Sequence, residues 1–164
     1  MANVLTGNIG IDDLFGREGN DTLHGGSGAA NTMLGQEGDD IYVVSAVGDT
    51  IIEFANEGRD AVQTALSSFT LRDNVEALVY TGSGAFTGIG TDMDNSLTGS
   101  GGADFLSGLG GADVIIGGNG ADELLGGSGN DSFRYLGGET GLDRILDFTS
   151  GQDRLELRDS AFAQ

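Results

Sequence analysis

The sequence predicts an all-β fold, a right-handed parallel β-roll built from glycine-rich nonapeptide repeats. Three observations lead to this prediction: a nine-residue period runs through two parts of the chain, glycine fills 31 of the 164 positions, and a large apolar residue recurs once in each period. Such periods are typical of solenoids, whose neighbouring coils share one continuous core. The right hand follows because crossovers between parallel strands are almost always right-handed.

The repeats form two blocks. Residues 90–134 read without a gap as GTDMDNSLT, GSGGADFLS, GLGGADVII, GGNGADELL and GGSGNDSFR. Residues 7–43 read as GNIGIDDLF, GREGNDTLH, GGSGAANTML and GQEGDDIYV, of which the third carries one extra residue. The shared pattern has glycine at the first and fourth positions, usually Asp at the sixth, and a large apolar residue at the eighth.

Each repeat predicts a six-residue turn followed by a three-residue strand. Glycine permits the unusual backbone conformations and close approaches of the turn. Side chains alternate along a strand, so the eighth residue should point inward and the seventh and ninth outward. Two repeats then make one coil, and alternate repeats stack into two parallel sheets. The inward residues expected are Leu14, Leu23, Leu34, Tyr42, Leu97, Leu106, Ile115, Leu124 and Phe133.

The chain divides into four segments on this pattern. Residues 1–43 form an N-terminal repeat block, and 44–89 form a β-rich spacer that continues or joins the roll. Residues 90–134 form the C-terminal repeat block, and 135–164 form a C-terminal cap. Because the cap ends abruptly at DSAFAQ, we expect a cut in a longer protein.

Charge points to a cation as the partner. There are 26 acidic residues against seven arginines, no lysine, and a formal net charge of −19. Nucleic acids and anionic membrane surfaces are bound through basic residues, so neither is an expected partner. Carboxylates at this density repel one another in a compact state. With no cysteine to form disulfides, we expect bound cations to offset that repulsion.

The sixth-position aspartates fit calcium, a hard cation that takes six to eight oxygen ligands. One coil is two repeats, so each turn should lie beneath the turn 18 residues later, with an ion between them. We therefore expect several Ca²⁺ ions, held by Asp21 with Asp40, Asn95 with Asp113, Asp104 with Asp122, and Asp113 with Asp131. Asp12 would pair with the turn at residues 25–31.

The pattern GGxGxDxUx, where U is a large apolar residue, resembles the RTX, or hemolysin-type, calcium-binding repeat. The resemblance implies a parallel β-roll, calcium in the turns, and a secreted, extracellular bacterial protein exported through a type I secretion apparatus. Residues 44–89 are similar to the spacers between repeat blocks of such proteins. The tail GLDRILDFTSGQDRLELRDSAF resembles the cap that follows the repeats of secreted proteases.

The resemblance also implies backbone carbonyl ligands, from the second and fourth positions of the earlier turn and the first and third of the later one. In the first block these are Arg17, Gly19, Gly35 and Glu37. In the second block they are Gly102, Gly108, Gly110, Gly111, Gly117, Asn119, Gly126 and Ser128.

Three places depart from the pattern. Asn31 stands where Asp belongs, which weakens the site shared with Asp12. Asn95 also replaces an aspartate, although Asp92 and Asp94 are alternative ligands. Above the turn of Asp122, either Glu139 or Asp143 would replace the missing Asp. By the same count, Asp131 has an aspartate partner only beneath it.

Catalysis lacks a recognisable constellation. His24 is the single histidine, which excludes an HExxH zinc site, and cysteine, lysine and a GxSxG motif are all absent. We therefore expect a calcium-folding module of an exported protein, attached to a catalytic or adhesive domain, and not an enzyme. A binding module for an extracellular polysaccharide is the alternative, and a free-standing hydrolase ranks last.

Two surface features complete the expectations. Phe105, Leu125, Val114 and Ile116 should point outward, either toward another domain or beneath the spacer or tail. The tail residues Arg144, Arg154 and Arg158 should pair with nearby carboxylates.

Overall fold

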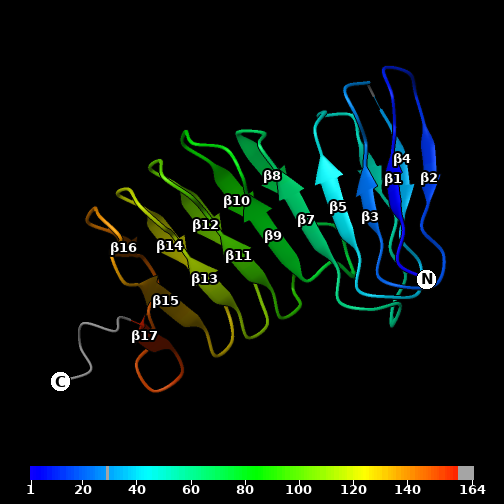
Figure 1. The fold of residues 1–164 in the computed structure, drawn as a ribbon. Coiled ribbons are helices and arrows are strands. Elements are labelled where there is room, and N and C mark those ends of the chain that lie inside the picture. Colours follow the sequence, from blue (N-terminus) through cyan, green and yellow to red (C-terminus); the bar gives the residue numbers. More distant parts are fainter. Residues whose placement is uncertain (29, 159–164) are drawn as a thin grey trace. The chain divides into compact units, whose positions relative to one another are not determined.

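The computed structural model describes residues 1–28 and 30–158 of the chain. These residues form 17 short β-strands and no helix, and none of them lies in a helix long and apolar enough to span a membrane. Figure 1 shows the strands in sequence order. The fold is the all-β parallel solenoid that the repeats predict. It divides into two compact units: Met1–Leu66 with Leu71–Val79, and Ser67–Thr70 with the chain from Tyr80 onward.

In the first unit, odd-numbered strands form one parallel sheet in the order β1-β3-β5-β7-β9 and even-numbered strands form another in the order β2-β4-β6. The strands are β1 (Val4–Thr6), β2 (Asp13–Phe15), β3 (Thr22–His24), β4 (Thr32–Leu34), β5 (Ile41–Val44), β6 (Thr50–Ile51), β7 (Ala61–Thr64) and β9 (Ala77–Tyr80), whose last residue counts with the second unit.

The second unit repeats this arrangement. One sheet has the order β8-β10-β12-β14-β16 and the other has β11-β13-β15-β17, all pairs being parallel. In Figure 1, β11, β13 and β15 lie side by side. The strands are β8 (Ser68–Thr70), β10 (Thr87–Ile89), β11 (Ser96–Thr98), β12 (Phe105–Ser107), β13 (Val114–Ile116), β14 (Glu123–Leu125), β15 (Ser132–Leu136), β16 (Arg144–Ile145) and β17 (Arg154–Arg158).

The register matches the repeat. Val114 pairs with Ser132 and Phe105 with Glu123, each 18 residues apart. In the first block Thr22 pairs with Ile41, because the extra residue lengthens that coil to 19. Two nonapeptides therefore make one coil, as expected.

The core is one file of inward eighth-position side chains in each unit. Leu23, Leu106 and Phe133 are fully buried, and burying a side chain of this size contributes about 1.5–3 kcal/mol. The expectation for Leu34 is wrong: Met33 is fully buried, while Leu34 is only half-buried. The extra residue of that repeat lies in the turn before Asn31, so Met33 becomes the eighth residue.

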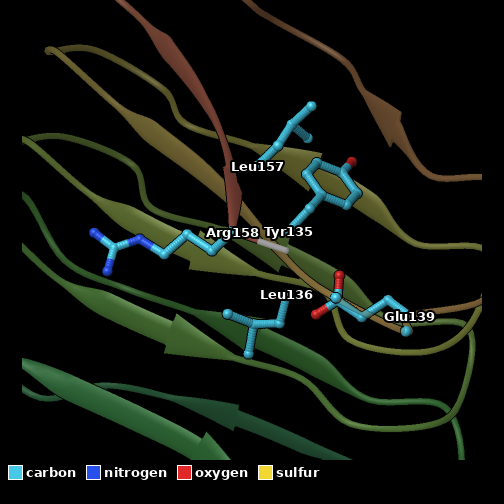
Figure 2. Close-up of a pocket in the computed structure, with 7 residues that line it drawn as sticks. Tyr135, Leu136, Glu139, Leu157 and Arg158 are labelled. Atoms are coloured by element: carbon cyan, nitrogen blue, oxygen red, sulfur yellow. The ribbon is translucent and has the colours of Figure 1, made fainter. Parts of the chain in front are cut away.

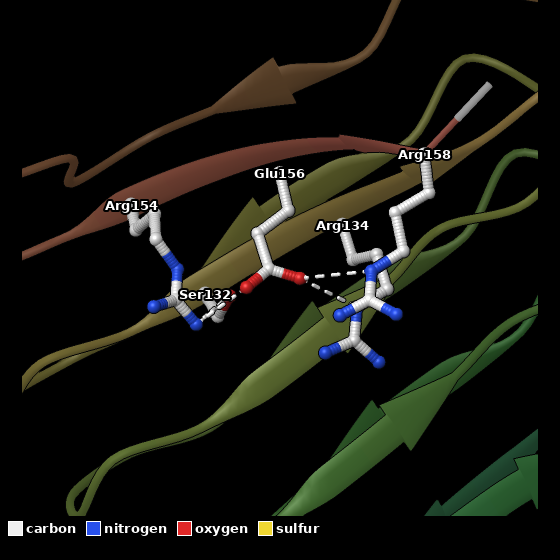
Figure 3. Close-up of polar contacts among 5 residues, drawn as sticks. All are labelled: Ser132, Arg134, Arg154, Glu156 and Arg158. Atoms are coloured by element: carbon white, nitrogen blue, oxygen red, sulfur yellow. Dashed lines mark hydrogen bonds and ion pairs between the residues drawn. The ribbon is translucent and has the colours of Figure 1, made fainter. Parts of the chain in front are cut away.

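The tail beyond the last repeat supplies a final strand to each sheet of the second unit, β16 beside β14 and β17 beside β15. Glu156 on β17 contacts three arginines, with ion pairs to Arg134 at 2.9 Å, Arg154 at 2.5 Å and Arg158 at 3.3 Å. Figure 3 shows these side chains around the one carboxylate. The hydrogen bond from Arg134 and the neighbouring guanidinium charges hold the pKa of Glu156 below its usual value.

Arg144 forms a separate pair with Glu123, at 2.6 Å. The tail arginines are therefore paired with carboxylates, as expected. The outward residues Phe105, Val114, Ile116 and Leu125 are half-buried on the sheet faces.

Candidate calcium sites

The sixth-position carboxylates form a ladder along each edge of the coils. Asp113 illustrates one rung: its Oδ1 accepts a hydrogen bond from the backbone N–H of Asn95, 18 residues earlier, at 2.7 Å. Asp122 receives the N–H of Asp104 at 2.8 Å, and Asp131 that of Asp113 at 2.9 Å. One carboxylate oxygen of each aspartate is therefore used to join its turn to the turn before it.

The second oxygen of these aspartates is buried and unpaired. Oδ2 of Asp21, Asp40, Asp113, Asp122 and Asp131 has no hydrogen-bond partner, and each of these residues is at most 1 % exposed. A buried ionised carboxylate without a partner is costly. A bound cation would remove that cost.

First-position glycines provide the space at these unpaired oxygens. A Cβ on Gly99 would lie within 3.0 Å of both Asp104 Oδ2 and the carbonyl oxygen of Gly117 in the next coil. Gly108 lies in the same way between Asp113 Oδ2 and the Gly126 carbonyl. The carboxylate and carbonyl oxygens thus border a space that the side chain of any other residue would fill. Such a space suits a cation with oxygen ligands.

Second and fourth positions need glycine for a different reason, because their backbone lies in the left-handed region. Gly120, at a fourth position, has φ 139°, and Gly118, at a second position, has φ 95°. Leu109 adopts φ 78° at the same second position without being glycine. The repeat therefore uses glycine for space at the first position and for conformation at the fourth.

Some of the predicted carbonyl ligands accept hydrogen bonds from the backbone of the neighbouring coil. The carbonyls of Gly35 and Glu37 accept the backbone N–H groups of Arg17 and Gly19, at 2.8 and 2.7 Å. The Ser128 carbonyl accepts the N–H of Gly111 at 3.0 Å. A carbonyl oxygen has two lone pairs, so these bonds leave each oxygen able to bind a metal.

The remaining predicted carbonyl positions lie on the same turns, between the same coils. Gly108, Gly117 and Gly126 direct their carbonyls toward the first-position glycine of the coil below, whereas the third-position residues Gly110 and Asn119 use their N–H groups, which bond to Thr91 and Ser100. Gly102 lies at a fourth position beneath Gly120.

Burial raises the pKa of the ladder carboxyls. The pKa of Asp113 rises from 3.8 to about 7 and that of Asp122 to about 6, with desolvation as the main cause and neighbouring carboxylates adding to it. The pKa values of Asp104 and Asp131 are also raised, again chiefly by burial. Without a cation, the coils thus favour the protonated carboxyls.

The structure also shows where the ladder departs from the sequence-based expectation. Asp12 is half-buried, and both of its oxygens accept hydrogen bonds from Asn8. Asn31, expected to be a weak substitute, accepts the Asp12 N–H and donates its own amide to Asp49. A donor nitrogen thus lies beside Gly25 where other turns have a carboxylate oxygen, and the weakness of this pair stays a prediction.

Asn95 is buried, and its Oδ1 accepts the N–H of Thr91 at 2.6 Å. Of the two alternative ligands near it, Asp94 is exposed and accepts the N–H of Ala112, and Asp92 is exposed as well. Neither carboxylate replaces Asn95 on the ladder.

The ladder continues into the tail. Of the two candidates above Asp122, Asp143 takes the position, because its Oδ1 accepts the Asp122 N–H at 2.9 Å. The expectation that Asp131 has an aspartate only beneath it is wrong: Asp153 accepts the Asp131 N–H at 3.1 Å. These rungs span 21 and 22 residues, so a count of 18 misses them.

Sequence reasoning also missed rungs in the spacer, residues 44–89. Asp49 accepts the N–H of Asn31, Asp60 that of Asp40, and Glu76 that of Asp60. The signal for one of them was present, because Gly58-Arg59-Asp60 reproduces the fourth to sixth positions of a repeat and the buried Val62 follows at the eighth.

A shallow pocket of about 290 Å³ lies in the second unit. Figure 2 shows Arg158 extending away from Glu139 across this pocket. The lining contains no serine, threonine or histidine. Its residues are Tyr135, Leu136, Gly137, Gly138, Glu139, Leu157 and Arg158.

Comparison with known protein families agrees with this geometry. The model of the RTX calcium-binding nonapeptide repeat matches residues 1–29, 89–124 and 98–133. These segments are RTX calcium-binding repeats. The resemblance expected from the motif is thereby confirmed, and with it calcium as the ion of the RTX repeats.

Two curated relatives come from Rhizobium meliloti (strain 1021). A protein named endo-1,3-1,4-beta-glycanase ExsH is 42 % identical over 89 residues, which are 54 % of this chain and 19 % of the relative. A protein named endo-1,3-1,4-beta-glycanase EglC is 35 % identical over 86 residues, 52 % of this chain and 18 % of the relative. The chain thus spans less than a fifth of the length of either relative.

Proposed function

We propose that this RTX chain is a calcium-dependent folding module of an exported protein, with ions held between successive turns at Asp21–Asp40, Asn95–Asp113, Asp104–Asp122 and Asp113–Asp131. The observation that carries the proposal is the row of unpaired Oδ2 atoms, buried on every one of these pairs. Each ion would be held by the carboxylate of one turn and the first-position carbonyl of the next.

Calcium binding and folding are coupled in this proposal. The buried carboxylates repel one another, and none of the ion pairs found among the described residues includes a ladder aspartate, so the ion would supply their counter-charge. An ion that binds only the folded chain stabilises it in proportion to the logarithm of its concentration. The chain would therefore remain open where calcium is scarce and fold where calcium is about millimolar, as outside the cell.

Export follows from that coupling as part of the same proposal. A chain that is unfolded in the cytosol can thread through a secretion channel, and folding outside opposes its return. We propose a type I secretion apparatus as the route, on the resemblance of the repeats to those of proteins exported in this way.

The test is a calcium titration of the chain followed by circular dichroism. We expect little β-structure in chelator and a cooperative gain at about 0.1–1 mM calcium, with magnesium a poor substitute. Asp122→Asn should raise the calcium midpoint, whereas Asp13→Asn, at an exposed seventh position, should leave it unchanged. A full β-spectrum in chelator that calcium does not alter would overturn the proposal.

We further propose that the module accompanies a catalytic domain that acts on a β-glycan, on the evidence of the two relatives named as glycanases. Glycan hydrolysis by the intact native protein, compared with residues 1–164 alone, tests this. Activity of the intact protein with none in the module supports it. Absence of glycan hydrolysis from the intact protein contradicts it.

A further inference from the structure

Three buried acids converge in the first unit, outside the segments that match the repeat family. One carboxylate oxygen from each of Asp40, Glu53 and Asp60 lies within 4.8 Å of the others. The three residues are 1 %, 7 % and 2 % exposed. Three carboxyl groups thus share a space from which water is almost excluded.

Each acid is held in place by the backbone around it. Asp40 precedes β5 and Asp60 precedes β7, and Asp60 Oδ1 accepts the N–H of Asp40 at 2.8 Å. Glu53 follows β6 and has no counterpart in the nonapeptide pattern. Its Oε1 accepts the hydroxyl of Tyr42, which in turn accepts the N–H of Gly35 at 2.6 Å.

The cluster contains oxygens without a partner. Asp40 Oδ2 and Glu53 Oε2 are buried and make no hydrogen bond. Gly35 keeps the adjoining space open, because a Cβ there would lie within 3.0 Å of both Asp40 Oδ2 and the Tyr42 hydroxyl. Unpaired oxygens beside open room are what a bound cation would explain.

Electrostatics agree with the geometry. Burial, and after it repulsion from Asp60, raises the pKa of Glu53 to about 8, while the pKa of Asp60 rises to about 7 and that of Asp40 to about 6. Glu57 adds further negative charge to Glu53 and Asp40. Ionising all three carboxyls together is therefore unfavourable near neutral pH unless a counter-charge is present.

We propose that Asp40, Glu53 and Asp60 bind a divalent cation of the calcium type, at a site in which Glu53 supplies a ligand from outside the repeat pattern. The ligands are all oxygens, which suit calcium, and the cluster contains none of the histidine or cysteine that zinc prefers. The site shares Asp40 with the Asp21–Asp40 pair and is coupled to it through that carboxylate, whereas it shares no residue with the repeat pairs of the second unit. With three carboxylates, it should bind before they do.

Tyr42 supplies a specific readout. Terbium replaces calcium at oxygen sites and emits when a nearby tyrosine absorbs light. The chain has three tyrosines and no tryptophan, and Tyr42 contacts Glu53 directly. The full chain should therefore show terbium emission of which Tyr42→Phe removes a part, the rest coming from Tyr135 beside Asp143. The number of calcium ions bound should stay unchanged because all three carboxylates remain.

Glu53→Gln tests the ligand itself, since glutamine keeps an acceptor for Tyr42 and removes the charge. We expect it to abolish the Tyr42-dependent emission and to weaken the first calcium step in calorimetry by about tenfold or more, the effect of roughly one lost charged ligand. Glu18→Gln, an exposed acid in the same unit, should change neither.

The outcomes separate this site from the repeat sites. Asp122→Asn should weaken calcium binding at the Asp104–Asp122 pair in the second unit and leave the Tyr42-dependent emission intact. If Glu53→Gln retains that emission and the first calcium step, the three acids share protons and hold no ion. Emission unaffected by Tyr42→Phe would overturn the proposal even if Glu53→Gln failed to fold.

Discussion

Residues 90–134 and the spacer of residues 44–89 build coils by different means. In the repeat block, coils have one length, and aspartate occupies the sixth position of every unit except the first. In the spacer, the rungs between Asp40, Asp60 and Glu76 span 20 and then 16 residues. Phe86 stands where a repeat has its sixth-position acid, and its backbone N–H donates a hydrogen bond to Asp104.

The difference shows which feature the coil requires. A side-chain oxygen that accepts the N–H of the preceding coil persists where spacing and residue type change. Phe86 is the exception, because an aromatic side chain stands there in place of the acid. The Phe86 ring stacks on the Tyr80 ring, with the ring centroids 4.4 Å apart. Backbone pairing between coils is therefore common to both regions, whereas the repeat block adds close packing and the buried acids that need an ion.

The loss of close packing between coils should have the largest effect on stability. Substituting one fourth-position glycine in each region compares the two regions directly. Gly129 has φ 141°, and a Cβ there would clash with the Gly111 carbonyl. We expect Gly129→Ala to cost about 3–5 kcal/mol, from backbone strain and overpacking together. Gly84, in the spacer, has no left-handed φ, and the nearest atom to its Cβ position is 3.9 Å away. Gly84→Ala should therefore change stability by less than about 0.5 kcal/mol. Denaturant unfolding in saturating calcium measures both, and equal losses would contradict the comparison.

Phe86→Ala and Asp113→Ala separate apolar from ionic stabilisation. Phe86 is 2 % exposed, so we expect its truncation to cost about 3–5 kcal/mol at every calcium concentration. Asp113 lies between Asn95 and Asp131 on the ladder, so its loss should weaken two sites. The slope of unfolding free energy against the logarithm of calcium concentration reports the ions released. It should fall for Asp113→Ala alone. Parallel slopes for both variants would mean that the carboxylates act as diffuse charge.

The pH dependence distinguishes the acidic turns from the aromatic one. A carboxyl whose pKa is raised by folding stabilises the fold below its ordinary pKa, and that contribution is lost as pH rises through the folded value. For Asp113 and Asp122 the loss should fall between about pH 4 and 7, at up to about 1.4 kcal/mol per pH unit for each group. In chelator, the chain should therefore show more β-structure by circular dichroism at pH 5 than at pH 8.

Calcium should reverse this trend, because protons compete with the ion for the carboxylates. The calcium midpoint should therefore rise as the pH falls. A circular dichroism spectrum in chelator that does not vary with pH would argue against buried, cation-requiring acids.

Sequence reasoning succeeded where the chain repeats itself. The pairing of Val114 with Ser132 and the burial of Leu106 follow from a period that holds every residue in register. It failed wherever coil length varied. The burial of Met33 was missed because the extra residue lies before Asn31. The rungs at Asp60 and Asp153 were missed because the coils that end in them are longer than 18 residues. Coil length outside the repeats depends on how loops pack, which no local pattern encodes.

The ladder of carboxylates also has a direction. Each rung joins a backbone N–H to an acid that comes later in the chain, although the strands also bond in the other direction, as the N–H of Val114 does to the carbonyl of Asn95. Shortening the chain from its C-terminal side would expose ladder donors that have lost their acceptors. Shortening it from the N-terminal side would release ladder carboxylates to water, which solvates them readily. Dependence along the ladder is thus polar, running from each turn toward the C-terminus.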